Sequence, residues 1–597
     1  MIAICSRLIR IFGKEDKLKF FFLFLGMLLN SILEIVGIGL ILPFIALLGR
    51  PGLLTTNVWL SRVFHESHFQ TFNQFMAAMA AGIAVVFVLK NVVLFLTTFW
   101  QTRFVYQKQS YLLCRLFNAY LMSPYSFHLR RDVGRLKHAL ESIPLVMVGV
   151  VLQVIYMTTE MVLVVFLFVF LLIANPLLTC FVMVFLGGAI FLFFAFLKGK
   201  LKEWGEIVRH QGALRMQAVE QGLGCIKEAK LAGKESFFAE KHRVHRQEDD
   251  RQTAKNEVIM KSTRLFIETI VVVLIMSGMM FFLMAGRAPD KILLTLSLFA
   301  IVAVRLMPSL NRISAALGSI RFYAPSFDAI YDDLMNCERM DTQHQDLQED
   351  GPILFQDQIE MRNINFSYEN TKSPAVKSVS LRIHKNTTVG FVGSSGAGKS
   401  TVVDIMLGLL PPTSGEVLVD GIDIRRHLRS WQSKIGYIPQ MIYLCDDTIK
   451  SNIAFGVATE DIDDKKVWQS LKLAQLEDFV RALPKGIDTV IGERGIRLSG
   501  GQRQRISIAR ALYHDPEVLV MDEATAALDN ETERDFMSAL DGLSGGKTII
   551  VIAHRLTTVH SCNKIFFLKE GQLLAEGTYD ELIKTCTPFR DMAGARR

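Results

Sequence analysis

A glycine-rich segment lies between two apolar runs and reads Gly393-Ser394-Ser395-Gly396-Ala397-Gly398-Lys399-Ser400-Thr401. Residues 388–392 before it are typical of a strand, and residues 402–407 after it are typical of a helix. A phosphate-binding loop requires this context. The glycines let backbone N–H groups close around the α- and β-phosphates of a nucleotide, Lys399 reaches the β/γ oxygens, and Ser400 offers its hydroxyl to Mg²⁺. The motif indicates a nucleotide-hydrolysing protein.

A second apolar run, residues 517–523, ends in two carboxylates, Asp522 and Glu523. This pattern is typical of a Walker B strand, whose aspartate holds the metal ion. Glu523 is then available to orient and activate water. Tyr368 lies upstream of the phosphate loop on a strand-like run and is predicted to stack on the adenine, although a tyrosine of the core would have the same pattern.

Half of the residues are hydrophobic, and the apolar runs are crowded into the first 320 or so positions. This distribution predicts an α-helical polytopic membrane domain followed by an α/β P-loop nucleotide-binding domain. The expected domains are a transmembrane domain at 1–330, a linker at 331–352 and an ATP-binding domain at 353–597. Six apolar segments are long enough to cross ~30 Å of hydrocarbon. They are residues 20–48, 75–100, 143–173, 177–197, 265–285 and 292–317.

The net charge of +8 invites a nucleic-acid interpretation. However, the basic residues of the first half lie between the apolar segments, where Lys and Arg set the orientation in a membrane. We therefore expect no nucleic-acid partner, and we expect the N-terminus, the basic loops 101–142 and 198–264 and the nucleotide-binding domain to be cytoplasmic. The eight cysteines lack metal-ligand spacing, so no zinc or redox site is expected.

The two basic loops are too long to be turns, so the membrane helices are predicted to continue into the cytoplasm. Residues 124–127 and 231–235 are candidate elbows that rest on the nucleotide-binding domain; the alternative is two flexible loops. The outer connection, residues 49–73, is predicted to contain a short amphipathic helix at the membrane interface. A loop that packs on the helix ends is the alternative there.

Residues 498–502 read Leu-Ser-Gly-Gly-Gln and resemble the signature of ATP-binding-cassette (ABC) proteins. Further segments match the family's motifs in the same order. Gln440 resembles the Q-loop glutamine, residues 492–495 resemble the exporter X-loop, Asp529 resembles the D-loop aspartate, and His554 resembles the switch histidine. The layout of six helices and one cassette is similar to that of an ABC exporter half-transporter of type I.

This resemblance implies ATP and Mg²⁺ as cofactors and a homodimer in which each ATP lies between two cassettes. The phosphate loop of one cassette would face Ser499, Gly500, Gly501 and Gln502 of the other, where a helix N-terminus offers N–H donors to the γ-phosphate. The implied catalytic residues are Glu523, His554 and Gln440; the implied metal ligands are Ser400, Gln440 and Asp522. Asp529 is also expected at the nucleotide. A heterodimer remains the alternative.

Within the exporters, the chain is most similar to the PglK-type flippases of bacterial protein N-glycosylation. The similarity is carried by Glu34, residues 306–313, residues 437–444 and the outer helix. It implies flipping of a polyprenyl-pyrophosphate oligosaccharide from the cytoplasmic to the outer leaflet of the bacterial inner membrane. An exporter of another amphiphile, such as lipid A or hydrophobic drugs, remains an alternative, as does an ATP-gated channel or regulator.

Four cations inside or beside the apolar segments are candidate substrate ligands. Counted at ~1.5 Å per residue from the outer helix ends, Lys90 and Arg305 both lie ~20 Å deep, and Arg264 and Arg312 both lie ~32 Å deep. A charge in a spanning helix usually faces a cavity or a partner, and a pyrophosphate is such a partner. In the alternative interpretation Arg264 pairs with Glu268, or the cations extend to the inner headgroups.

Overall fold

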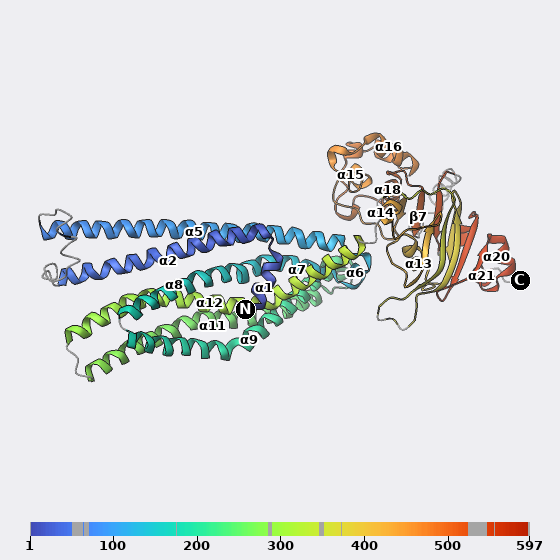
Figure 1. Cartoon of the computed structure of the whole chain (residues 1–597). Coiled ribbons are helices and arrows are strands. Elements are labelled where there is room, and N and C mark those ends of the chain that lie inside the picture. The colour runs from blue at the N-terminus through green and yellow to red at the C-terminus, as the bar shows by residue number, and fades with distance from the viewer. Residues whose placement is uncertain are drawn as a thin grey trace. The chain divides into compact units, whose positions relative to one another are not determined.

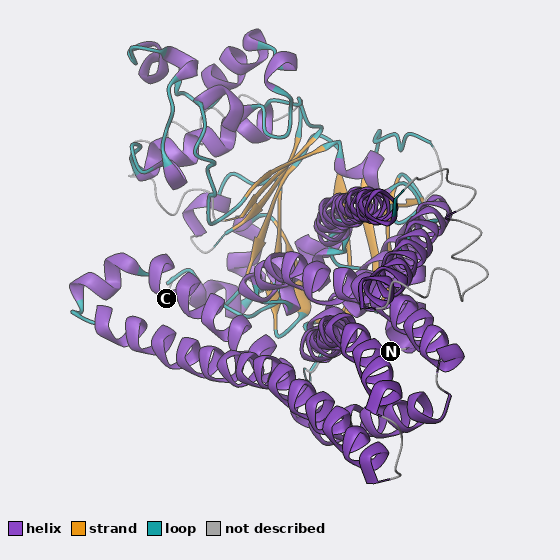
Figure 2. Cartoon of the chain, turned by 90° about the vertical axis from the view of Figure 1, so that its left-hand side faces the viewer, coloured by secondary structure: helices purple, strands orange, loops and turns teal. Residues whose placement is uncertain are grey.

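The computed structural model describes residues 2–49, 64, 71–174, 176–284, 289–345, 351–369, 371, 373–522, 546–553 and 556–594. The chain divides into two compact units (Figure 1). The first contains Met1–Ser123 and Phe127–Asp341, and the second contains Thr342–Arg597 together with the short segment Pro124–Ser126. In Figure 2 the first unit is helical, and the strands belong to the second unit.

The first unit is built from long helices that run side by side (Figure 1). Its elements are α1 (Ile2–Ile11), α2 (Lys14–Gly49), α5 (Phe72–Met122), α6 (Tyr125–Arg130), α7 (Val133–Val146), the π-helical segment η1 (Met147–Leu152), α8 (Gln153–Ala174), α9 (Pro176–Gly224), α10 (Ile226–Leu231), α11 (Glu235–Met284) and α12 (Pro289–Gln345).

Within the described residues, four segments are long and apolar enough to span a membrane: Asp16–Ile45, Phe72–Met122, Val133–Ile173 and Thr179–Gly224. They coincide with the first four predicted spans. The fifth predicted span coincides with the C-terminal part of α11, and the sixth lies within α12. Some of the side chains of both spans lie outside the described residues.

The helices are longer than a membrane requires. α5 has 51 residues, or about 75 Å at 1.5 Å per residue, against ~30 Å of hydrocarbon. It begins where the Thr71 hydroxyl accepts a hydrogen bond from the Gln74 backbone N–H, and it ends at Ser123, before a proline that cannot continue a helix. The long helices agree with the prediction that the basic loops are helical extensions.

The π-helical segment η1 joins α7 to α8 without a break in the helix. Gly149 at its centre lies so close to Tyr323 of α12 that an added Cβ would be 2.3 Å from the Tyr323 ring. The Ser319 hydroxyl donates to the Gly149 carbonyl oxygen over 2.9 Å. A neighbouring helix therefore satisfies a carbonyl in the widened turn.

The predicted linker at 331–352 is shorter than expected, because α12 continues to Gln345. Ile330, Leu334 and Cys337 are buried at helical spacing, so this part of α12 still packs on the first unit. The division between the units falls after Asp341.

The structure describes both of the predicted elbow segments, but it describes only one residue of the predicted outer helix. Pro124–Ser126 groups with the second unit. The other elbow is the turn between α10 and α11, where Leu231 is 81% exposed. The predicted outer helix lies outside the described residues except for Phe64, whose ring packs edge-on against Phe75 with the centroids 5.3 Å apart.

The second unit contains two sheets. The first is antiparallel, with strand order β2-β1-β4-β5, and the second has the order β10-β9-β3-β8-β7-β6. In the second sheet only β10 is antiparallel to its neighbour. The strands are β1 (Gln358–Phe366), β2 (Val376–His384), β3 (Thr388–Val392), β4 (Ser414–Val419), β5 (Ile422–Asp423), β6 (Ile435–Ile438), β7 (Val518–Asp522), β8 (Thr548–Ile552), β9 (Lys564–Lys569) and β10 (Gln572–Gly577).

The parallel strands are nearly continuous apolar runs because both faces of this sheet are covered. All of β8 is buried, as is most of β3 and β7. The α-helices among the described residues of this unit are α13 (Lys399–Met406), α14 (Leu428–Gln432), α15 (Ile449–Ile453), α16 (Asp464–Leu473), α17 (Glu477–Arg481), α18 (Gly500–Leu512), α20 (Tyr579–Thr585) and α21 (Thr587–Met592). α18 packs against α15, α16 and β6.

Candidate functional site: a nucleotide site at a sheet edge

Four neighbouring parallel strands end at the same edge of the second sheet. The register pairs Phe391 of β3 with Ile552 of β8, Ile552 with Asp522 of β7, and Met521 with Ile438 of β6. The carboxyl edge of a parallel sheet is where α/β proteins bind ligands. The phosphate loop follows β3 at this edge, and Asp522 is the last residue of β7.

The glycines of the phosphate loop are required by its geometry. Gly398 has φ of +95°, in the left-handed region, and an added Cβ would lie 2.7 Å from the Ala375 carbonyl oxygen. At Gly393 an added Cβ would lie 2.2 Å from the Leu568 carbonyl oxygen. The loop therefore requires glycine at positions 393 and 398.

Lys399 begins α13 and is 5% exposed. Its ammonium donates to the carbonyl oxygens of Gly393 at 2.8 Å and Ser394 at 3.1 Å, so it lies across the loop that surrounds the phosphates in the predicted complex. Ser394, Ser395, Gly396 and Ser400 are exposed, whereas Ala397 and Thr401 are buried. The exposed part of the loop thus includes Ser400 with its hydroxyl, whereas the Lys399 ammonium is held within the loop by two carbonyl oxygens.

Tyr368 lies beside this loop. Its hydroxyl is 3.1 Å from the Thr401 hydroxyl, and its ring packs edge-on against Phe366 with the centroids 4.9 Å apart. These contacts hold the ring next to the first turn of α13. Stacking of Tyr368 on adenine remains a prediction, but its position is compatible with it.

Acidic groups gather next to the loop. Burial raises the pKa of Asp404 of α13 to about 6, and the nearby carboxylate of Asp522 adds to the shift. Burial also raises the pKa of Tyr437, and the carboxylate of Asp522 makes the second-largest contribution to this increase. Sequence reasoning did not identify Asp404 or Tyr437 as residues of the site. For Asp404, the single carboxylate in the apolar helix after the loop was a usable signal.

The predicted metal ligands form a set that fits Mg²⁺. The Ser400 hydroxyl, the Asp522 carboxylate and the exposed Gln440 amide are hard oxygen donors, which Mg²⁺ prefers. A cation would also neutralise the repulsion between Asp404 and Asp522. Glu523, Asp529 and His554 lie outside the described residues, so their roles stay predictions.

The signature segment forms the start of α18, a helix of 13 residues. Ser499 caps it: its hydroxyl accepts from the Gln502 N–H at 3.2 Å, and the Gln502 amide oxygen accepts from the Ser499 N–H at 2.8 Å. An added Cβ at Gly500 would meet no atom within 4 Å. The helix therefore offers an open N-terminus to an anion, with Gly501 in its first turn.

Arg510, which sequence reasoning also missed, fixes the other end of α18. Its guanidinium donates to the carbonyl oxygens of Asn452 at 2.7 Å and Tyr443 at 3.0 Å. It thereby connects the signature helix to α15 and to the segment that follows Gln440. The helix also contains Arg503 and Arg505, so charge alone did not single out Arg510 in the sequence.

In the first unit, two of the candidate substrate ligands meet at one carboxylate. The Lys90 ammonium lies 2.9 Å and the Arg305 guanidinium 2.7 Å from the Glu34 carboxylate. The side chains of Lys90 and Glu34 are 3% and 8% exposed, but that of Arg305 is 41% exposed. We refer to these three residues as the Glu34 cluster.

The other two cations differ from each other. The Arg312 guanidinium lies 2.6 Å from the buried carboxylate of Glu160. Arg264 is exposed, and in the described part of the chain it forms no ion pair with Glu268 or any other residue. The substrate role of all four cations remains a prediction.

Comparison with known proteins agrees with this geometry. Residues 376–526 match the family model described as ABC transporter. A putative multidrug export ATP-binding/permease protein of Staphylococcus aureus is 42% identical over 229 residues, which is 38% of this chain and 39% of the relative. An ATP-dependent lipid A-core flippase of Syntrophus aciditrophicus is 42% identical over 228 residues, 38% of this chain and 37% of the relative. The chain thus matches about two fifths of the length of these curated relatives.

The chain is also similar to the structure of a bacterial Atm1-family ABC exporter with ATP bound. The TM-score is 0.78 at 22% identity, and the match covers 96% of this chain and 98% of the other. The predicted fold class is therefore confirmed: the chain has the fold of an ABC exporter, a helical transmembrane domain followed by an α/β nucleotide-binding domain.

Proposed function

We propose that the chain is one half of an ATP-hydrolysing exporter that works as a homodimer. The observation that carries the proposal is the pair of complementary anion sites on one cassette. The phosphate loop and Asp522 stand at the sheet edge, and the capped N-terminus of α18 is open to a phosphate. Two copies arranged head to tail would enclose ATP between these sites.

In this mechanism Lys399 and the loop N–H groups bind the phosphates, and Ser400, Gln440 and Asp522 would hold Mg²⁺. The bound Mg²⁺ would neutralise charge on the phosphate oxygens. Glu523 would orient the attacking water and accept its proton, and His554 would serve as the switch histidine. The N-terminus of α18 on the partner cassette stabilises the negative charge that develops on the transferred group.

For the substrate we propose a lipid-linked oligosaccharide carried on a polyprenyl pyrophosphate, flipped from the cytoplasmic to the outer leaflet of the bacterial inner membrane. The Glu34 cluster supports this choice, because two cations on one carboxylate leave a net positive charge inside the apolar unit. Arg305 is the exposed member of the cluster. A pyrophosphate would bind Arg305 in competition with Glu34, and Arg264 would add an exposed cation that has no ion-pair partner among the described residues.

The names of the curated relatives favour a second candidate, export of lipid A-core or of hydrophobic drugs. Reconstitution into proteoliposomes separates the candidates. A labelled lipid-linked oligosaccharide, a labelled lipid A and a hydrophobic dye would each be assayed for translocation with and without ATP, and the Glu523→Gln variant would serve as the inactive control. ATP-dependent movement of the oligosaccharide lipid supports the proposal. Movement of only the lipid A or the dye would replace it with the second candidate.

A further inference from the structure

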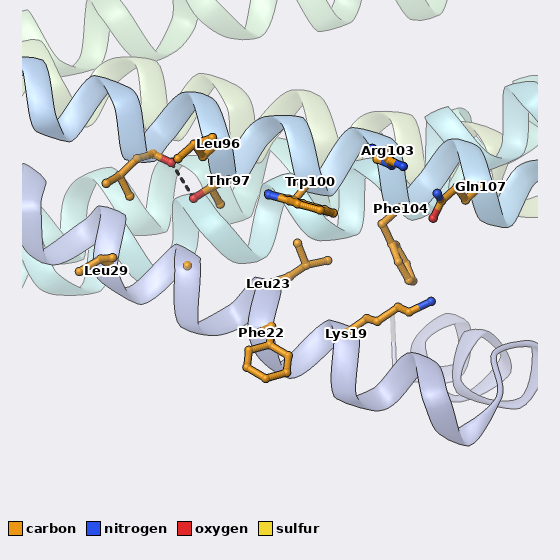
Figure 3. Close-up of a pocket in the computed structure, with 12 residues that line it drawn as sticks. Lys19, Phe22, Leu23, Leu29, Leu96, Thr97, Trp100, Arg103, Phe104 and Gln107 are labelled. Atoms are coloured by element: carbon orange, nitrogen blue, oxygen red, sulfur yellow. Dashed lines mark hydrogen bonds between the residues drawn. The ribbon is translucent and has the colours of Figure 1, made fainter.

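A groove of about 640 Å³ runs between α2 and α5 and is separate from both the nucleotide site and the Glu34 cluster (Figure 3). Most of its wall is apolar. It is lined by Lys19, Phe22, Leu23, Gly26, Leu29, Val93, Leu96, Thr97, Trp100, Arg103, Phe104 and Gln107.

The length of the groove matches one membrane leaflet. The two helices are antiparallel, so the lining runs from Lys19 to Leu29 on α2 while it runs from Gln107 back to Val93 on α5. The ten-residue stretch of α2 spans about 15 Å and the fourteen-residue stretch of α5 about 21 Å, whereas half of a ~30 Å hydrocarbon core is about 15 Å. The groove thus covers one leaflet and reaches the headgroup level. An extended acyl chain of one leaflet would therefore lie along the whole apolar wall.

The polar groups of the groove are gathered at one end. In Figure 3, Lys19 of α2 and Arg103 and Gln107 of α5 are at the same end of the groove, on its two sides, while Leu29 and Leu96 are at the other end. The basic end is the one that the positive-inside rule assigns to the cytoplasmic surface. The groove thus has an apolar body and a cationic mouth at headgroup level.

The two cations at this mouth have no acidic partner within the described part of the chain. Among the described residues, Lys19 and Arg103 form no ion pair, and the Arg103 guanidinium lies 5.7 Å from the centre of the Trp100 ring. The next cation along α5, Lys108, is 2.6 Å from the Asp16 carboxylate. The mouth therefore has an unsatisfied charge that an anion would complement.

We infer that this groove binds one anionic phospholipid of the inner leaflet. Its phosphate lies between Lys19 and Arg103, and one acyl chain lies against Gly26, Leu29 and Trp100. Basic pockets between spanning helices on the cytoplasmic side are where acidic headgroups bind, and the apolar wall supplies the contact for the chain. The inference goes beyond the proposed function, since it holds for any transported substrate.

Trp100 provides a direct readout. The purified full-length protein would be reconstituted with phospholipids brominated along one acyl chain, which quench a tryptophan that they touch. Subtracting the signal of a Trp100→Phe variant isolates the groove. We expect Trp100 quenching to saturate at a lower mole fraction of brominated phosphatidylglycerol than of brominated phosphatidylcholine, by about ten-fold, and the preference to shrink in high salt.

Matched variants test the headgroup and the chain separately. Lys19→Ser and Arg103→Ser should each reduce the preference for phosphatidylglycerol about five-fold, whereas Lys17→Ser removes the same charge on the same helix outside the groove and should not. Gly26→Leu should abolish the quenching, because its first carbon has room at 3.4 Å from Thr97 while the rest fills the groove. Gly39→Leu is the control, since Gly39 is also uncrowded but does not line the groove.

Each variant would be checked for monodisperse elution and for ATP hydrolysis, so that a folding defect is recognised. If Lys19→Ser or Arg103→Ser shows such a defect, Lys19→Gln or Arg103→Gln is used instead. Equal quenching by the two lipids would overturn the inference, because the groove would then hold ordinary boundary lipid. The absence of Trp100-dependent quenching would also overturn it, because a second copy of the chain would then cover the groove.

Discussion

For single substitutions in the Glu34 cluster, we predict that Lys90→Met destabilises the protein more than Arg305→Met does, whereas Arg305→Met impairs transport more. Lys90→Met removes the most deeply buried cation of the cluster, whose side chain is 3% exposed. Removing one member of a buried ion pair costs about 3–5 kcal/mol when the other charge is left alone. Here the Glu34 carboxylate keeps Arg305 at 2.7 Å. We therefore expect a smaller loss of about 2–3 kcal/mol for Lys90→Met.

Arg305→Met should destabilise the protein less, by about 1 kcal/mol, because Glu34 keeps Lys90 and because water already reaches the 41% exposed Arg305. The double variant Lys90→Met, Glu34→Gln also removes the buried carboxylate that has lost one of its two cations, and water reaches the remaining Arg305, so it should recover most of the loss. In flipping of the lipid-linked oligosaccharide the order should reverse, with Arg305→Met the more damaging single change, since only Arg305 is exposed to a headgroup.

The assay is thermal unfolding of the purified protein in one detergent at one scan rate, because unfolding of a membrane protein is often irreversible and its midpoint then depends on the rate. Transport is measured on the same preparations in proteoliposomes. A Lys90→Met midpoint equal to that of the wild type would refute the reasoning. So would an Arg305→Met variant that unfolds as early as Lys90→Met, because burial would then not decide the cost.

Three further predictions concern the cassette. Glu523→Gln should keep ATP binding, measured with a fluorescent analogue, and slow hydrolysis at least ~100-fold, because the proton acceptor is lost; near-normal turnover would require another base. Ser499→Ala should impair hydrolysis as much as Lys399→Ala, and mixing the two variants should restore activity, since one composite site of each mixed dimer is intact; normal hydrolysis by Ser499→Ala alone would disprove the shared site. Burial raises the pKa of Glu517, but hydrogen bonds from Lys434 and Lys385 outweigh it and hold the pKa below its usual range; this carboxylate therefore stabilises the fold at neutral pH, and the stabilisation is lost as the pH falls through the lowered pKa. Glu517→Gln should thus lower the melting temperature at pH 7.5, by the equivalent of about 1 kcal/mol, and the difference from the wild type should shrink steadily as the pH is lowered into the acidic range.

The phosphate loop could be predicted from sequence because each of its features is local. The loop glycines that the structure requires, the strand before them and the helix after them all lie within one short stretch. The end of the Walker B strand at Asp522 has the same property, since an apolar run defines it. Such motifs specify their own backbone, so little knowledge of the rest of the fold is needed.

The surroundings of these motifs could not be predicted in the same way. Counting residues along separate helices placed Lys90 and Arg305 at one depth, and both do contact Glu34, but the count could not show that Lys90 is buried and Arg305 is not. That difference depends on how the helices rotate about their axes. The repulsion between Asp404 and Asp522 likewise depends on a contact between distant segments.

The end of α12 shows a third kind of limit. Its acidic, polar composition beyond position 331 is typical of a linker, and yet the helix continues because Leu334 and Cys337 still pack on the first unit. A few buried residues at helical spacing outweighed the composition of the whole segment.

The widened turn at η1 gives the third spanning helix a point about which its two halves can differ in twist. One residue of an α-helix corresponds to about 100° of rotation, and a π-helical turn contains roughly one residue more than an α-helical one. If the extra residue moved out of η1, α7 would rotate by that angle relative to α8 while the helix stayed continuous. Gly149 makes such a turn compatible with the tight contact to Tyr323, and the Ser319 hydroxyl compensates the carbonyl. A torque applied to one end of this continuous helix can therefore rotate α7 and α8 by different angles.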